Sequence, residues 1–171
     1  MLVSSYKRVR EISSCPDLLK GKVYIQEKID GYNASIWCEK GFIHYSHSGV
    51  DYFGKQIDFY GLGKYLGSHN GFKALFKKFP DIKLNGEWLV KKAVKQTEYD
   101  DKSYNTFYLY DVDIDEFTKM DIEDVYTLAS EFQISTTPMF GRFNEPSLMT
   151  VKNLVGRSEL GKVGEGIVFK N

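Results

Sequence analysis

Alternating apolar and polar residues along the first third of the chain predict a sheet built from hairpins. Residues 22–27 (KVYIQE) alternate and are rich in β-branched and aromatic side chains, which is typical of a strand, and Gly31 interrupts the pattern. Residues 33–38 (NASIWC) and 42–46 (FIHYS) follow the same rule, and residues 39–41 (EKG) suit a tight turn between them. One strand followed by a β-hairpin is therefore predicted.

Helical spacing of apolar residues marks two later segments. In residues 71–79 (GFKALFKKF), one apolar stripe faces away from the lysines and consists of Phe72, Leu75, Phe76 and Phe79. Residues 121–132 predict a second helix, with Asp121 as its N-cap. The expected buried face of that helix consists of Ile122, Val125, Tyr126, Ala129 and Phe132.

The remaining apolar runs predict more strands than helices. Residues 82–90, 106–113, 139–143 and 166–169 indicate strands, and Pro146 is expected to open another helix. Because the strands come mostly as hairpins, the pattern favours an α+β fold with antiparallel sheets over a doubly wound parallel sheet. No repeat, linker or low-complexity stretch divides residues 1–171, so a single domain is expected.

The composition limits the type of ligand site and the cellular location more than it limits the fold. The 171 residues carry 23 basic and 23 acidic side chains, so any site for a polyanion has to be local. Aromatic residues reach 15%, and a few of them could stack on bases while most form the core. Cys15 and Cys38 lack metal-ligand spacing, no signal peptide is evident, and no run approaches the roughly 18 apolar residues of a membrane span. A soluble intracellular protein is expected.

The first candidate for chemistry is Lys28, within QEKIDG at the end of a predicted strand. A lysine attacks only as the neutral amine, and its ordinary pKa is about 10.4. A nucleophilic lysine therefore needs desolvation or a cationic neighbour. Gly31, three residues later, permits a sharp turn or a close approach. Taken alone, the segment is equally compatible with a surface lysine before a turn.

Three further segments place an acid or an aromatic ring within apolar runs. They are NGEW with Glu87, FYLYDV with Tyr110, and GEGIVFK with Glu165 and Lys170. A buried acid is costly unless it binds a partner. Each segment also has an ordinary interpretation, as an outward-facing glutamate, an aromatic strand or a turn before a strand. Their order along the chain is what makes the set informative.

The series EKIDGYN, NGEW, FYLYDV and GEGIVFK resembles motifs I, III, IIIa and IV of the covalent nucleotidyltransferase superfamily, which contains DNA ligases, RNA ligases and mRNA-capping guanylyltransferases. The resemblance runs from about residue 24 to the end of the chain. It implies an adenylation domain in which antiparallel sheets, flanked by helices, enclose a nucleotide cleft. It also implies ATP with Mg²⁺ or Mn²⁺, a lysyl-AMP intermediate on Lys28, and RNA 5′-phosphate and 3′-hydroxyl ends as substrates.

Position by position, the resemblance implies a role for each matching residue. Glu87 would bind the ribose, Tyr110 would stack on adenine, and Glu165 would organise the phosphate and the metal, directly or through water. The Gln26–Glu27 segment would contact the adenine edge. The remaining residues implied in nucleotide binding are Asp30, Gly31, Asn33, His47 and Lys170.

Two departures from the family pattern affect these expectations. His47 stands where RNA ligases of the phage and editing type usually carry an arginine, and histidine lacks the permanent bidentate charge of that residue. No K-x-K of motif V follows Glu165, and a C-terminal nucleic-acid-binding domain is not recognised. A fragment of a longer ligase is therefore expected, one that binds ATP or AMP but adenylates itself slowly, with Lys170 as a partial substitute for the motif V cations.

Within the superfamily, the resemblance favours a phage-type RNA ligase acting in RNA repair. Asn33, GEWLV around Glu87 and the FYLYDV form of motif IIIa all match small RNA ligases. A DNA ligase ranks second, and a capping enzyme, which usually has aspartate at the position of Glu165, ranks third. A nucleotide- or RNA-binding domain without turnover is the alternative from another class. The sequence leaves a viral or a cellular source open.

Overall fold

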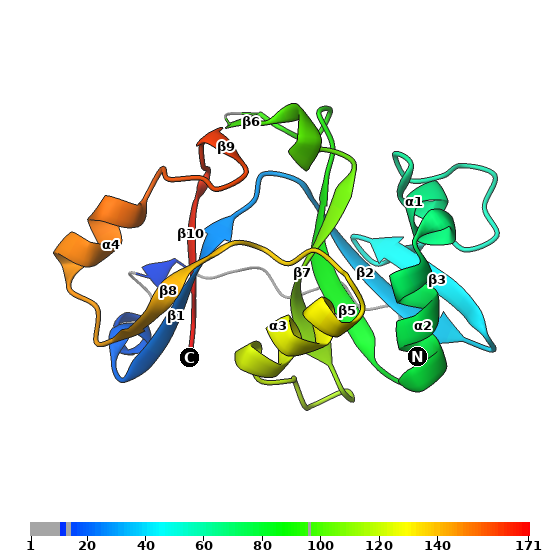
Figure 1. Cartoon of the computed structure of the whole chain (residues 1–171), viewed down its shortest axis with the longest axis horizontal. Helices are drawn as coiled ribbons and strands as arrows, with labels where there is room; N and C mark the ends of the chain where they lie inside the picture. Colours follow the sequence, from blue (N-terminus) through cyan, green and yellow to red (C-terminus); the bar gives the residue numbers. More distant parts are fainter. Residues whose placement is uncertain (1–10, 13–14, 96) are drawn as a thin grey trace.

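The computed structural model describes residues 11–12, 15–95 and 97–171, which form two main antiparallel sheets flanked by helices (Figure 1). The smaller sheet has the order β10-β1-β8, with strands Gly166–Lys170, Lys22–Lys28 and Met139–Asn144. The larger has the order β4-β3-β2-β5-β7, with strands Val50–Asp51, Phe42–His47, Tyr32–Glu39, Lys83–Leu89 and Thr106–Asp113. A third pair joins β6 (Glu98–Tyr99) and β9 (Gly161–Val163). The predicted α+β class is confirmed.

The hairpin of β2 and β3 forms at the predicted place. Glu39 pairs with Phe42, and the two residues between them, Lys40 and Gly41, have φ values of 51° and 82°. Two successive positive φ values match the right-handed twist of the flanking strands, which is why a glycine is favoured at such a turn. The turn therefore fixes the register of β2 against β3, and on its other edge β2 pairs with β5, with Asn33 opposite Glu87.

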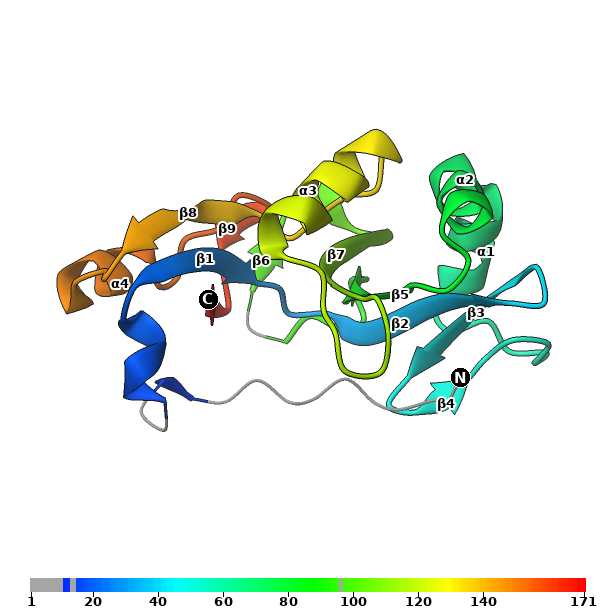
Figure 2. The ribbon, with the colours of Figure 1, turned by 90° about the horizontal axis from the view of Figure 1, so that it is seen from below.

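Helices α1 (Leu62–Ser68), α2 (Asn70–Lys78) and α3 (Ile122–Glu131) lie on the same side of the larger sheet (Figure 2). The stripe predicted for α2 is confirmed, with Phe72, Leu75 and Phe76 buried and Phe79 half-buried. In α3 the buried residues are Val125, Leu128 and Ala129. These helices and the sheet enclose the main hydrophobic core, which includes Ile36, Leu84, Trp88, Phe107 and Leu109.

Strand β1 contacts a different helix through each of its faces. Tyr24 hydrogen-bonds Glu123 of α3, and the Gln26 amide donates to the Tyr126 hydroxyl over 2.9 Å. On the opposite face, Val23 and Ile25 form a small core with Leu154 of α4 (Leu148–Leu154). Because α3 also packs on β7, it holds the smaller sheet beside the larger one.

Several details differ from the expectations. Tyr126 and Ile122 are only half-buried, since Tyr126 serves as the partner of Gln26, and Leu128 takes a place in the buried face. Asp121 precedes α3 but makes no side-chain cap, while α4 begins after Ser147, whose hydroxyl accepts from the Thr150 amide, and not at Pro146. The elements without a sequence prediction are α1, β4, β6, β9 and the 3₁₀ helices Pro16–Leu19 and Asp101–Ser103. No helix in the described part of the chain is long and apolar enough to cross a membrane.

Candidate functional site

A cavity of about 820 Å³ lies between the two main sheets. Lys28, Glu87, Tyr110 and Glu165 all line it, although 137 positions separate Lys28 from Glu165. The other predicted residues on its wall are Gln26, Glu27, Asp30, Gly31, Asn33 and Lys170. The predicted convergence of these distant segments on one cavity is confirmed, as expected when a fold assembles a ligand site from several elements.

Lys28 is the last residue of β1 and faces the turn into β10. The antiparallel register pairs Lys28 with Gly166, so Glu165 lies beside it and its carboxylate forms an ion pair with the Lys28 ammonium. The lysine side chain remains 41% exposed, which keeps Nζ accessible from the cavity. The sequence argument asked for desolvation or a cation next to this amine, whereas the structure places acids there.

Glu87 is the second acid of this end of the cavity. Burial raises its pKa to about 8, the negative charge of Glu165 adds to this rise, and the charge of Lys28 opposes it. The backbone N–H of Gly31 donates to the Glu87 carboxylate. A Cβ atom on Gly31 would lie 2.8 Å from Cγ of Glu87 and 2.8 Å from the Trp88 carbonyl oxygen. The glycine of this motif is therefore required by a close approach to β5.

Tyr110 reaches the cavity because β7 contains an irregularity. Asn85 pairs with Asp111 while the next residue, Gly86, pairs with Leu109, so Tyr110 is the extra residue of a β-bulge. Bulges turn a side chain away from the regular alternation of a strand. The Tyr110 hydroxyl accepts a hydrogen bond from the Asn33 amide, and this contact fixes the ring across the cavity from Lys28.

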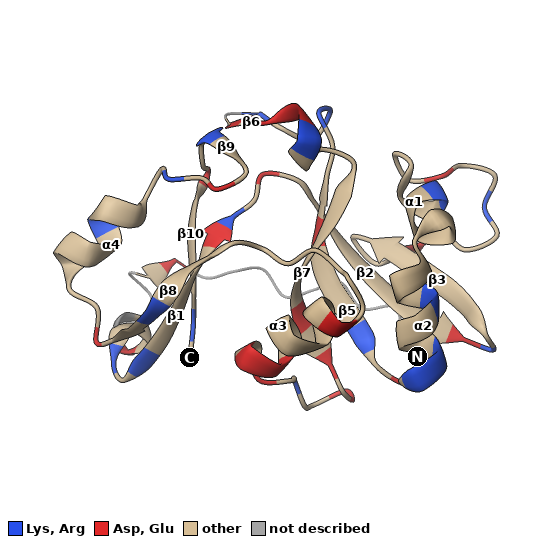
Figure 3. Cartoon of the chain, viewed as in Figure 1, with Lys and Arg blue, Asp and Glu red and all other residues tan. Residues whose placement is uncertain are grey.

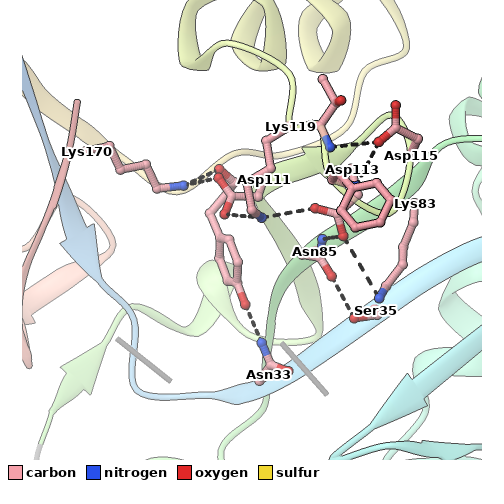
Figure 4. Close-up of polar contacts among 12 residues, drawn as sticks. Asn33, Ser35, Lys83, Asn85, Asp111, Asp113, Asp115, Lys119 and Lys170 are labelled. Carbon is pink, nitrogen blue, oxygen red and sulfur yellow. Dashed lines mark hydrogen bonds and ion pairs between the residues drawn. The ribbon is translucent and has the colours of Figure 1, made fainter. Parts of the chain in front are cut away.

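Lys170 lines the cavity, but its charge is used within the protein (Figure 4). Its ammonium forms an ion pair with Asp111, donates to the Tyr110 carbonyl over 2.5 Å, and lies 5.3 Å from the centre of the Tyr110 ring. Burial lowers the pKa of Lys170, and the nearby carboxylate of Asp111 opposes that change. Lys170, which was expected to face a phosphate, therefore links β10 to β7 in this structure.

Asp30 anchors the loop that follows β5. Its carboxylate accepts from the Lys95 amide over 2.8 Å and from the Thr97 hydroxyl over 3.4 Å. Its own backbone N–H donates to the Tyr99 hydroxyl over 2.8 Å. The segment that follows Lys28 is thereby fixed to the loop after β5.

The side chains of Gln26 and Glu27 are buried and hydrogen-bonded to other residues of the protein. The Glu27 carboxylate accepts from the Ser158 hydroxyl over 2.5 Å and from the Glu159 amide over 2.9 Å. Burial raises the Glu27 pKa, and these two donors oppose the rise. Both residues line the cavity, and the expected contact of this segment with an adenine edge stays a prediction.

His47 does not line the cavity. Its Nδ1 lies 2.7 Å from the Asn33 carbonyl oxygen, and its ring stacks on Phe59 with 4.7 Å between centroids. The neighbouring Ser48 lines the cavity instead. The nucleotide contact expected of His47 stays a prediction, while the structure shows its ring in contact with the Asn33 backbone.

Part of the cavity wall was not recognised in the sequence. Besides Ser48, it includes apolar residues from both ends of the chain, among them Leu18, Val151, Val155, Ile167 and Phe169. Only Ile167 and Phe169 had a signal, since they alternate along a predicted strand. In the described part of the chain no group of three or more His, Cys, Asp or Glu side chains could hold a metal by itself. Glu87 and Glu165 nevertheless suit Mg²⁺, which binds one or two carboxylates together with substrate phosphates.

A strand-end lysine facing two glutamates, with a tyrosine ring across a cavity between two antiparallel sheets, defines a nucleotidyltransferase-type domain. Comparison with protein families identifies it more closely. Residues 21–171 match the family model described as RNA ligase, and the chain belongs to that family. No curated protein sequence matches significantly.

Solved structures share this fold at low sequence identity. A point mutant of the Naegleria gruberi RNA ligase with ATP and Mn has a TM-score of 0.75 and 17% identity, covering 100% of this chain and 53% of that one. The same enzyme with PPi gives a TM-score of 0.75 at 17% identity, with coverages of 100% and 53%. An archaeal ATP-dependent RNA ligase gives 0.73 at 16% identity, with coverages of 98% and 45%. The chain spans about half the length of these structures.

Proposed function

We propose that this domain is the adenylate-accepting part of an ATP-dependent RNA ligase, with Lys28 as the nucleophile. The observation that supports the proposal best is the convergence of Lys28, Glu87, Glu165 and Tyr110 on one cavity. Of the structures it resembles, one is described with ATP and Mn and another with PPi, which are a substrate and a product of such a step.

The proposed reaction joins Nζ of Lys28 to the α-phosphorus of ATP. A nitrogen–phosphorus bond forms, the bond from the α-phosphorus to the bridging oxygen breaks, and pyrophosphate leaves. Nζ has to lose its protons, and the Glu165 carboxylate, already in contact with it, is placed to receive one. Glu87, with its pKa near 8, can donate or accept a hydrogen bond at the ribose near neutral pH.

Positioning of the nucleotide falls to residues on three strands. Tyr110 offers a ring face to adenine, because Asn33 holds its hydroxyl and Lys170 its carbonyl. Adenine stacking on such a held ring orients the α-phosphate towards β1. In phosphoryl transfer the protein contributes mostly orientation and compensation of charge. This division of labour suits a site whose chemical group is a single lysine.

A divalent cation completes the charge balance of the site. Glu165 and Glu87 would hold Mg²⁺ or Mn²⁺, directly or through water. When bound, the ion neutralises charge that develops on the phosphate oxygens. Two acids lie beside one ammonium in this site; burial raises the pKa of Glu87, and the charge of Glu165 adds to that rise.

The lysyl-AMP would then be passed to the 5′-phosphate of an RNA strand for joining to a 3′-hydroxyl. The carboxylates and the tyrosine ring around Lys28 support only the step with the nucleotide. The proposed transfer of AMP to RNA rests on the family membership of the chain. RNA joining is an activity proposed for a whole ligase, and this chain spans about half the length of the solved RNA ligases it resembles.

Incubation of the chain with α-³²P-labelled ATP and Mg²⁺ tests the first step. Label that stays on the protein through acid precipitation is expected for the unmodified chain and for Lys22→Ala, a matched lysine at the other end of β1. Lys28→Ala should carry none. Equal labelling of Lys28→Ala and the unmodified chain would refute the assignment, and labelling from GTP in preference to ATP would favour a guanylyltransferase.

A further inference from the structure

Tyr60, between β4 and α1, presents a fixed aromatic ring to solvent. The side chain is 43% exposed, yet its ring stacks on Tyr32 with 5.0 Å between centroids and 11° between planes. The indole N–H of the buried Trp88 donates to the Tyr60 carbonyl over 3.2 Å, which fixes the backbone. The position of the ring is thus set from two sides by the core of the larger sheet.

A cationic loop lies against this ring. The Lys92 ammonium is 5.0 Å from the Tyr60 centroid, and Lys95 follows on the same loop after β5. Neither lysine forms an ion pair with any of the described residues, whereas the adjacent Lys91 pairs with Asp101 over 2.7 Å. Lys92 and Lys95 therefore keep their charge available to a ligand.

The ring and the loop are both connected to the strand end that carries the nucleophile. Asp30, two residues after Lys28, binds the Lys95 amide, and Tyr32, four residues after Lys28, stacks on Tyr60. Four residues of chain span at most about 14 Å, so the Cα atom of Tyr32 lies within that distance of the Cα atom of Lys28. His47, which meets the Tyr32 ring edge-on at 5.5 Å, leads directly to Ser48 on the cavity wall.

Packing alone explains only part of this arrangement. Covering Tyr32 requires one ring, but it does not require the ring's outer side to be exposed or two uncompensated ammonium groups to lie beside it. Elsewhere, basic residues lie on α2 and acidic residues on α3 (Figure 3), and the chain has no net charge. Aromatic rings interleaved with cations are how proteins bind single-stranded nucleic acid without sequence preference.

We propose that Tyr60, with Lys92 and Lys95, binds a single-stranded segment of RNA next to the strand end that is processed at Lys28. One base would stack on the outer face of Tyr60, displacing the Lys92 ammonium that now lies over the ring, and the flanking phosphates would contact the two lysines. The proposal rests on the proposed ligase function for the identity of the ligand. It concerns a surface outside the cavity, so it can fail independently.

Binding of a fluorescein-labelled 12-nucleotide RNA, followed by anisotropy at low and moderate salt, tests the platform. Tyr60→Ala should weaken binding about tenfold, and Tyr60→Trp should retain it, because stacking needs a ring and no particular base. Lys92→Ala with Lys95→Ala should weaken binding and flatten its salt dependence. Lys91→Ala, the matched control for a neighbouring lysine already paired with Asp101, should stay within about twofold.

Self-adenylation of each variant separates the two proposals. Unchanged labelling of Lys28 in Tyr60→Ala, together with weaker RNA binding, supports the platform. Unchanged RNA binding in Tyr60→Ala, no RNA binding by the unmodified chain, or parallel loss of labelling and binding would overturn it. If no variant labels but RNA binding still depends on Tyr60, the platform stands and the proposed adenylation fails. Cross-linking of 4-thiouridine RNA to Tyr60, mapped by mass spectrometry, gives an independent readout.

Discussion

Two regions of the molecule, around Lys28 and around Lys170, contain the same kinds of charged residue in opposite balance. Around Lys28, one ammonium faces the carboxylates of Glu165 and Glu87. Around Lys170, lysines meet the acids of β7 in a continuous network (Figure 4). Its ion pairs join Lys170 to Asp111, Lys119 to both Asp111 and Asp113, and Lys83 more loosely to Asp113.

The difference separates charges that stabilise the fold from charges that serve a ligand. Compensated carboxylates in the network tie β10 to β7 and hold Tyr110 in place. Near Lys28, burial drives Glu87 towards its protonated form with a pKa near 8, and the charge of Glu165 adds to this rise. A buried acid with a strongly shifted pKa in a cavity is typical of a site that serves a ligand.

Removal of Lys28 should have the largest effect on activity. Lys28→Ala is expected to abolish covalent labelling while the thermal midpoint changes little, because the partly exposed strand-end side chain is not part of a core. Lys170→Met should instead leave measurable labelling and reduce stability. Labelling and thermal melting of both variants check these outcomes. Labelling that is lost in Lys170→Met but kept in Lys28→Ala would contradict the roles assigned to the two lysines.

Asp111→Ala should cause the largest loss of stability. It leaves Lys170 and Lys119 without the carboxylate they share, and breaking a buried pair costs about 3 kcal/mol. Nucleotide affinity should fall as well, since the network holds Tyr110. Lys20→Ala, which breaks the exposed pair with Asp17, is the control and should not change the denaturant midpoint measurably. Equal midpoints for Asp111→Ala and the unmodified chain would contradict a structural role.

Glu87→Gln should change how stability depends on pH. The folded-state pKa of about 8 lies above the ordinary value of 4.5, so between these values the native state binds a proton that the unfolded state has lost. Stability therefore falls as pH rises through this window. Relative to the unmodified chain, the glutamine variant should gain about 3 kcal/mol between pH 6 and pH 9. Denaturant titrations at both values measure it, and parallel pH profiles would argue that Glu87 is ionised throughout.

The smallest effect is expected at the turn that Glu27 holds. Ser158→Ala removes one of the two donors to this buried carboxylate and should cost about 1 kcal/mol. Because the same segment leads to Glu165, adenylation should slow while nucleotide affinity changes little. Ser68→Ala, which removes an exposed helix contact, is the matched control. A rate equal to that of the control would show that Glu165 is positioned without this turn.

The sequence by itself determined most elements and the membership of the site. Alternation and helical spacing placed β1, the β2–β3 hairpin, β5, β7, α2, α3 and β10, because these patterns are local consequences of burying one face. The short elements α1, β4, β6 and β9 escaped, since segments of so few residues carry no periodicity of their own. The motif residues were recognised because their order along the chain resembles that of the covalent nucleotidyltransferase motifs.

Only the tertiary structure decided what each of these residues does. Four contacts depend on partners that are distant in the sequence. They are the β-bulge that turns Tyr110 into the cavity, the ion pair of Lys170 with Asp111, the hydrogen bond of Glu27 with Ser158, and the contact of His47 with the Asn33 backbone. Sequence spacing fixes which face of a strand a side chain occupies. Whether its charge meets a partner or remains for a ligand depends on which strand packs opposite, and only the fold brings those strands together.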